Sequence, residues 1–163
     1  QEENTLVIFS SDHGDNDASH KLEHKTVLYE ESVNIPFMVM WKGHIDGGRV
    51  DSIHLVSNGI DLLPTVCDYA GINAIADPRG RSLRSILENR DVTWRNTLGA
   101  ESEIGRMVIS KDKFKYDVVG IEEQLLNLNK DPYETTHFTN DPQYKNKLNE
   151  LKKAFDSEWF PGY

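Results

Sequence analysis

The chain has little cysteine, no excess of positive charge and no long apolar run. Cys67 is the only cysteine among 163 residues, which excludes an internal disulfide and a cysteine-rich zinc site. It falls in the apolar stretch Leu62–Cys67, where a small buried side chain is expected rather than a nucleophile. No apolar run approaches the ~20 residues of a membrane span.

The charge balance excludes further classes of partner. Lys and Arg number 18 against 27 Asp and Glu, a formal charge of −9. This argues against a nucleic-acid partner or an anionic membrane, because both attract basic surfaces. Apolar residues make up 37% and charged residues 28%, ordinary values for a globular chain with a real core. An acidic protein that uses an anionic substrate must gather positive charge locally, which draws attention to single lysines and to bound cations.

Residues 1–94 have the pattern of an α/β fold. Thr5–Ser10 and Ile35–Trp41 are predicted strands of a parallel sheet, buried on both faces. A short helix is expected from Val27, ending before Pro36. Ser57–Ala70 is a predicted helix that Ser57 or Asn58 caps and Gly71 ends. Its expected apolar face consists of Ile60, Leu63, Val66, Cys67 and Ala70.

Residues 95–163 change character and predict a second, smaller part. Three alternating segments separated by turn residues indicate an antiparallel meander: Met107–Ser110, Phe114–Val118 and Glu123–Leu128. Tyr144–Phe155 is a predicted amphipathic helix with Leu148, Leu151 and Phe155 on one side. The fold class is therefore α/β, followed by a small antiparallel sheet with a C-terminal helix, and the expected domains are 1–94 and 95–163.

Asp12, His13 and Lys25 are the residues that point most directly to chemistry. Asp12 and His13 directly follow the first predicted strand, the position where open α/β sheets place ligands. Asp12 offers the oxygen that hard cations prefer, and His13 leaves the identity of the metal open. Lys25 could return to the same point and meet an anion, which suggests a sulfate or phosphate ester. The alternatives are that Asp12 caps a turn, His13 is a hydrogen-bonded neighbour and Lys25 is solvated.

His20 and His24 share the short loop between these candidates. A histidine beside an ester could act as a general acid or orient the anion. Both are equally compatible with an ordinary place on the surface.

The order and spacing of these motifs resemble the second half of a sulfatase, in the alkaline phosphatase superfamily. The most specific block is Leu6–Gly14, followed by His20, Lys25 and Tyr29–Pro36. The resemblance continues through Ile60–Thr65 and Gly80–Leu83, and ends in Gln124–Leu128 with Asp131-Pro132-Tyr133-Glu134.

This resemblance implies a calcium-dependent sulfuric ester hydrolase with an alkaline-phosphatase-like sheet, with Mg²⁺ or Mn²⁺ as other metals. It implies that Asp12 and His13 bind the metal and that Lys25 contacts the sulfate. His20 matches a position near the substrate or leaving group, and His24 matches no family role. A sulfated small molecule or glycan is the implied substrate, and a periplasmic or extracellular location is implied by resemblance alone.

The sequence departs from the family pattern at the nucleophile. Sulfatases carry a Cys-x-Pro-x-Arg or Ser-x-Pro-x-Arg segment whose first residue becomes formylglycine, and no such segment occurs here. Cys67 is followed by Asp68 and Tyr69. We therefore expect this chain to be the C-terminal part of a sulfatase, with the N-terminal half as its partner. Alone, it is expected to be inactive and to expose apolar surface from the Thr5 and Ile35 strands.

The sequence is also compatible with three other functional hypotheses. A phosphonate or phosphate ester hydrolase of the same superfamily could have a similar metal loop. A non-catalytic module could bind sulfated glycans without turnover. A purely structural segment could carry these residues without using them.

Overall fold

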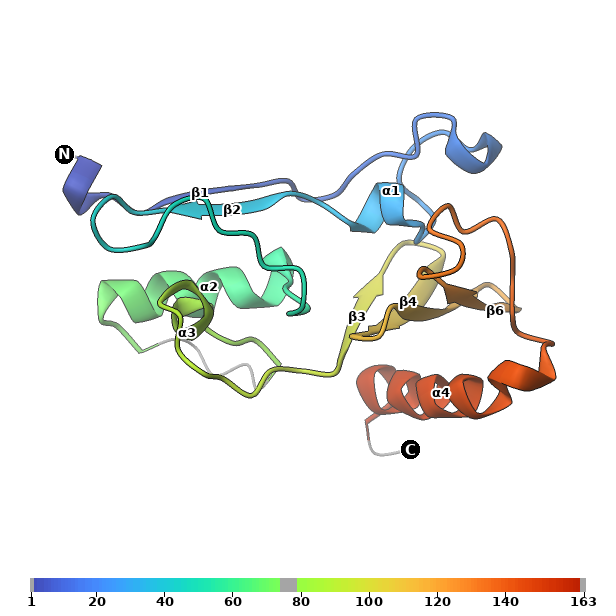
Figure 1. Ribbon diagram of the computed structural model, residues 1–163. Coiled ribbons are helices and arrows are strands. Elements are labelled where there is room, and N and C mark those ends of the chain that lie inside the picture. Colours follow the sequence, from blue (N-terminus) through green and yellow to red (C-terminus); the bar gives the residue numbers. More distant parts are fainter. Residues whose placement is uncertain (1, 74–78, 162–163) are drawn as a thin grey trace. The chain divides into compact units, whose positions relative to one another are not determined.

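The computed structural model describes residues 2–73 and 79–161, and these form two compact units (Figure 1). The first unit comprises Gln1–Asp12 and Pro36–Trp94, and the second comprises His13–Ile35 and Arg95–Tyr163. Residues 13–35, which the expected domain division assigns to the first part, thus group with the C-terminal residues. Among the described residues, no helix is both long and apolar enough to cross a membrane.

The first unit contains a two-stranded antiparallel sheet, β1 (Val7–Ser10) and β2 (Phe37–Met40). The expectation of a parallel sheet does not hold for this pair. Because alternate side chains of a strand share a face, the register Val7↔Met40 and Phe9↔Met38 places four apolar side chains together. Their exposed fractions are 43% for Val7, 57% for Phe9, 57% for Met38 and 62% for Met40.

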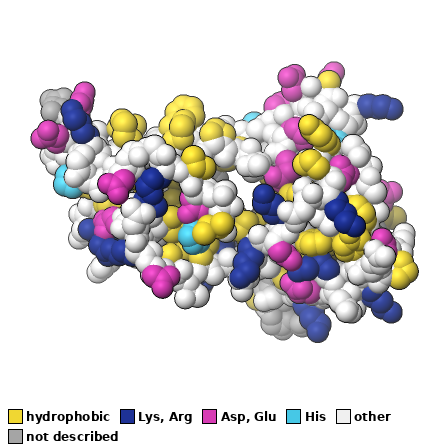
Figure 2. Space-filling view, viewed as in Figure 1, with side chains coloured by type: hydrophobic (Ala, Val, Ile, Leu, Met, Phe, Trp, Pro, Cys, Tyr) yellow, Lys and Arg dark blue, Asp and Glu magenta, His cyan; other side chains and the backbone are white. Residues whose placement is uncertain are grey.

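This apolar face is the largest departure from the predicted burial of β1 and β2. One face of the pair is open rather than both being buried, which confirms the expected exposure of apolar surface from these strands. Figure 2 shows hydrophobic side chains gathered over β1 and β2. A contiguous open apolar face of this kind is uncommon on a monomeric protein.

Helix α2 (Asn58–Ala70) follows Ser57 and ends at Gly71, whose φ of 68° is the left-handed conformation expected there. Its buried side differs from the predicted apolar stripe. Asp61, Thr65 and Cys67 are buried, whereas Leu63 and Val66 are 52% and 42% exposed. The burial of Cys67 confirms its predicted structural role.

Asp61 and Thr65 are buried because they satisfy backbone donors. Asp61 accepts hydrogen bonds from the backbone N–H of Ser57 and of Arg81, both at 2.9 Å. The Thr65 hydroxyl accepts from the Leu83 N–H at 2.9 Å. These contacts fix α2 to the residues before α3 (Arg84–Leu87), and a hydrophobicity pattern does not reveal them.

The second unit contains a four-stranded antiparallel sheet in the order β3-β4-β5-β6. Its strands are Thr97–Glu101, Gly105–Ser110, Phe114–Val119 and Glu122–Asn127, followed by helix α4 (Lys145–Trp159). The predicted meander and terminal helix are confirmed, and β3 is an additional strand. Short 3₁₀ turns lie at Glu2–Asn4, Ser19–Lys21 and Pro142–Tyr144.

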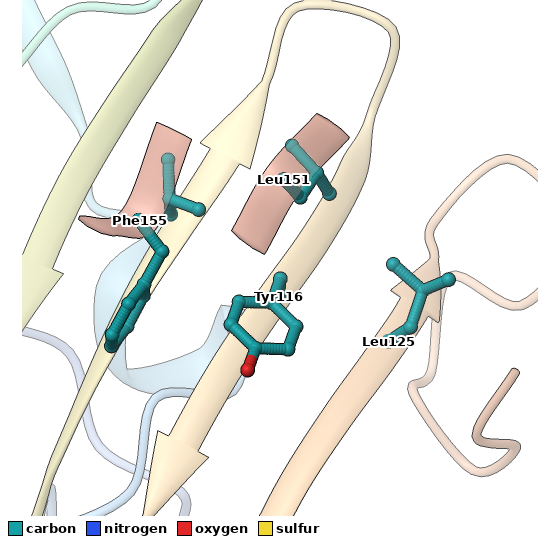
Figure 3. Close-up of a cluster of buried hydrophobic side chains, with 5 residues drawn as sticks. Tyr116, Leu125, Leu151 and Phe155 are labelled. Atoms are coloured by element: carbon teal, nitrogen blue, oxygen red, sulfur yellow. The ribbon is translucent and has the colours of Figure 1, made fainter. Parts of the chain in front are cut away.

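Helix α4 covers one face of this sheet and forms the core of the second unit with it. The buried cluster consists of Val108, Tyr116, Leu125, Leu151 and Phe155. Figure 3 shows the side chains of Leu151 and Phe155 directed from the helix toward the strands. The rings of Tyr116 and Phe155 meet edge to face, with their centres 5.3 Å apart.

The opposite face of the sheet carries the segment that contains helix α1 (Glu30–Val33). Lys115 of β5 alternates with Tyr116 and therefore points away from α4. Its ammonium donates to the Leu28 carbonyl oxygen at 2.8 Å. This contact ties the segment to the sheet of the second unit.

Candidate anion and cation site

The structure brings together two of the predicted site residues, Lys25 and His13. The ammonium of Lys25, an exposed residue, donates a hydrogen bond to Nε2 of the half-buried His13. The two residues are 12 positions apart in the chain. Of the predicted convergence of Asp12, His13 and Lys25, the contact between His13 and Lys25 is present within the second unit.

The hydrogen bonds of His13 define which ring nitrogen carries a proton. Its Nδ1 lies 2.6 Å from the Gly14 carbonyl oxygen, which can only accept, so Nδ1 is the donor. An ammonium can only donate, so Nε2 accepts from Lys25. In this arrangement the Nε2 lone pair is directed at the Lys25 ammonium. The same arrangement, with Nδ1–H held by a carbonyl, is usual for histidines that bind metals.

Asn16 holds the end of the loop near Lys25, a role that the sequence analysis missed. It is 1% exposed, and its side-chain amide donates to the His24 carbonyl oxygen at 2.5 Å. Its backbone N–H donates to the same oxygen at 3.2 Å. Asn16 therefore fixes the residue before Lys25, and the only signal in the sequence is an asparagine in a polar loop. The ring of His24 is given no role by these contacts.

Asp12 lies in the first unit, because the chain passes from one unit to the other between Asp12 and His13. Its side chain is exposed, and the Ser11 hydroxyl donates to it at 3.5 Å. The Ser11 carbonyl oxygen in turn accepts from the Asn58 side chain at 2.6 Å. The end of β1 is thus tied to the first residue of α2, and the Asp12 side chain beside it is exposed.

His20 is placed against Tyr29 and Glu31. Its ring stacks on that of Tyr29 with the centres 3.7 Å apart and the planes 9° apart. Its Nε2 lies 3.6 Å from a carboxylate oxygen of Glu31. These contacts orient His20 by packing, while the predicted role in catalysis or substrate binding remains a proposal.

His20, Glu31 and Glu134 offer one ligand atom each within 4.8 Å of one another. Glu134 is 2% exposed and its carboxylate is already engaged. One oxygen pairs with the Lys115 ammonium, and the other accepts from the Glu30 N–H at 2.6 Å. We therefore assign Glu134 to the contacts that hold α1 rather than to a metal.

Burial raises the pKa of three groups in this part of the second unit: Asp117, Tyr29 and Glu134. It raises the pKa of Asp117 to about 6, against the opposing effect of the Lys115 ammonium. Burial also raises the pKa of Tyr29, with Asp117 and Glu134 adding to the effect. Burial likewise raises the pKa of Glu134, and Lys115 opposes the rise. The Lys115 ammonium thus offsets a carboxylate-rich interior.

Comparison with solved structures defines the class of protein. The chain superposes on a 2-O GAG sulfatase with a TM-score of 0.85 and 32% identity, covering 96% of this chain and 36% of that one. It also resembles a phosphonate monoester hydrolase of Agrobacterium radiobacter, with a TM-score of 0.83 and 23% identity, over 95% of this chain and 35% of that one. The second likeness shows the fold alone. The class is that of proteins with the alkaline-phosphatase-like mixed α/β fold.

The family follows from the sequence comparisons. The family model for "N-sulphoglucosamine sulphohydrolase, C-terminal" matches residues 18–102. An arylsulfatase of Clostridium perfringens is 34% identical over 161 residues, which is 95% of this chain. The chain belongs to the sulfatase family. It spans 34% of the length of that arylsulfatase, about a third.

Proposed function

We propose that this chain forms part of a sulfuric ester hydrolase and supplies one side of its sulfate and metal site. The observation that carries the proposal is the contact between the Lys25 ammonium and His13 Nε2. It places a cation that can bind an anionic ester beside a histidine of the predicted metal site. Family membership adds the reaction class, and the GAG sulfatase among the similar structures supports a sulfated sugar as substrate.

In this proposal Lys25 binds a sulfate oxygen through a charge-assisted hydrogen bond. His13 keeps its proton on Nδ1, and its Nε2 would be available to the metal once the Lys25 ammonium turns to the sulfate oxygen. His20, stacked on Tyr29, serves the substrate or leaving-group side as a candidate general acid. The nucleophile is proposed to be a formylglycine contributed from outside these 163 residues.

The donors in the chain fit a divalent cation as part of a larger ligand set. Asp12 gives a surface carboxylate and His13 gives a neutral nitrogen with its other ring nitrogen already bonded. We propose Ca²⁺, with Mg²⁺ or Mn²⁺ as the other candidates. When bound, the cation would offset the negative charge that develops on the sulfate group.

Replacing Asp12 by asparagine tests the metal assignment. We expect Asp12→Asn in the complete sulfatase to lose most of the bound metal, because a neutral amide is a much weaker ligand than a carboxylate. Elemental analysis of the purified protein measures this directly. Asp17→Asn is the matched control in the same loop and is expected to keep full occupancy. Full occupancy in Asp12→Asn would show that the ligand was misassigned.

Paired substrates test the reaction itself. The complete enzyme is expected to turn over an aryl sulfate much faster than the matching aryl phosphate or phosphonate. Faster turnover of the phosphorus esters would assign the protein to the alternative hydrolase class. Retention on a sulfated-glycan column without turnover of any ester would instead support a binding module.

The apolar face of β1 and β2 supports another part of the same protein as partner. We propose that the remaining part of a sulfatase, corresponding to the two-thirds of its relatives that this chain does not span, covers this face. A periplasmic or extracellular location remains part of the proposal on the family resemblance alone.

A further inference from the structure

Lys115 lies in the most enclosed charged environment of the second unit. Its side chain is 0% exposed, although lysine is rarely buried without a specific partner. Besides the Leu28 carbonyl oxygen, its ammonium contacts a Glu30 carboxylate oxygen at 3.1 Å and pairs with Glu134. The partners lie 85 and 87 residues earlier and 19 residues later in the chain, so the contacts join distant segments.

Together with Lys115, Glu134 holds the backbone of residues 28–30 in place. It accepts the Glu30 N–H at 2.6 Å while it pairs with Lys115. Its φ is 53°, a left-handed conformation that costs a residue with a β-carbon free energy. Surrounding contacts must therefore maintain this conformation. The Glu134 carboxylate makes two of them, one with the Lys115 ammonium and one with the Glu30 N–H.

Residues 28–30, which Lys115 and Glu134 hold in place, lead into the helix that contacts the candidate site. The backbone of Gly14 packs directly against the carbonyl groups of Glu31 and Ser32, which follow Glu30. The Gly14 N–H donates to the Ser32 oxygen at 2.8 Å, and Gly14 follows His13. Tyr29 lies between the Leu28 carbonyl and the Glu30 N–H, and its ring stacks on that of His20.

We propose that Lys115 and Glu134 are positioning residues for His13, Lys25 and His20. They anchor the start of α1 to the antiparallel sheet, and α1 in turn fixes the loop that presents the three side chains. This inference rests on the proposed function for its catalytic consequence. Its structural consequence, order in residues 13–35, is independent of any activity.

The test uses the variant Lys115→Met in the complete enzyme, assayed well below its melting temperature. We expect kcat for an aryl sulfate to fall about 10²-fold with KM changed less than about threefold, because a misplacement of ~1 Å in a site has an effect of this size. Lys147→Met is the matched control. Lys147 is a lysine with 18% of its side chain exposed that pairs with Asp112 and Glu150, and its loss is expected to leave kcat unchanged.

A double-mutant cycle separates positioning from general stability. If Lys115 acts through Lys25, then Lys115→Met in a Lys25→Ala background should lower kcat only a few-fold further. Equal losses in both backgrounds would overturn the proposal for Lys25, and an unchanged kcat in Lys115→Met would overturn it for all three side chains. If Lys115→Met yields no folded protein, Glu134→Gln takes its place, since it keeps the shape and an oxygen for the Glu30 N–H.

Hydrogen exchange provides a readout that needs no activity. Amides of residues 13–35, including that of Gly14, should exchange at least about tenfold faster in the variant, while the control matches the wild type. Unchanged exchange in this segment would overturn the proposal. If the wild-type enzyme turned over no sulfate ester, the proposed function would fail, and the exchange comparison alone would decide whether the segment is anchored as inferred.

Discussion

Lys25→Ala is expected to lower kcat/KM for a sulfate ester by about 10²- to 10³-fold, the range seen when one charge-stabilising donor is removed from an active site. The melting temperature should change little, since Lys25 is exposed and its ammonium hydrogen-bonds to a single ring nitrogen. Steady-state kinetics and calorimetry on the complete enzyme measure the two effects separately.

The control for Lys25→Ala is Lys21→Ala, which removes the same charge from the same exposed loop. It should keep nearly full activity, so a general loss of positive charge cannot account for the effect. Parallel losses of activity and melting temperature in Lys25→Ala would contradict a direct role with the substrate.

Gly14→Ala is expected to reduce activity at least about 10²-fold and also to lower the melting temperature. A β-carbon at residue 14 would lie 1.9 Å from the Glu31 carbonyl oxygen, and a backbone atom cannot move aside as a flexible side chain can. The loop would have to separate from α1, which breaks the bond from Gly14 N–H to Ser32 and shifts His13. Kinetics and thermal unfolding report the two consequences.

Gly47→Ala is the matched control for this substitution. No atom lies within 4 Å of a β-carbon at residue 47, and its φ is not in the left-handed range. We therefore expect wild-type activity and stability. A Gly14→Ala enzyme with normal kcat would show that the close contact with α1 is not needed for the site.

Local patterns predicted the second unit well because its elements follow simple periodicities. The alternation around Tyr116 and Leu125 and the helical spacing of Leu151 and Phe155 all face the same buried cluster. Lys115 could not be interpreted in this way, since its burial depends on carboxylates far along the chain. The contacts that bring residues 13–35 to this sheet were missed for the same reason.

In the first unit, the predicted buried face of α2 was wrong because polar side chains occupy part of it. Asp61 and Thr65 are buried because each satisfies backbone groups of another segment, whereas Leu63 and Val66 remain at the surface. The meeting of Lys25 and His13 was predicted from their positions after the first strand, but the role of Asn16, which holds the loop that presents Lys25, was not. A polar loop has no period from which such a contact could be derived.

The open face of β1 and β2 contains its own chemical reporter. Met38 and Met40 expose their thioethers there, while Met107 is 4% exposed and enclosed by the second unit. Peroxide converts accessible thioethers to sulfoxides, so the first two methionines register whether this face is uncovered and the third serves as an internal standard. Oxidative damage would thus fall first on a sulfatase whose parts have come apart.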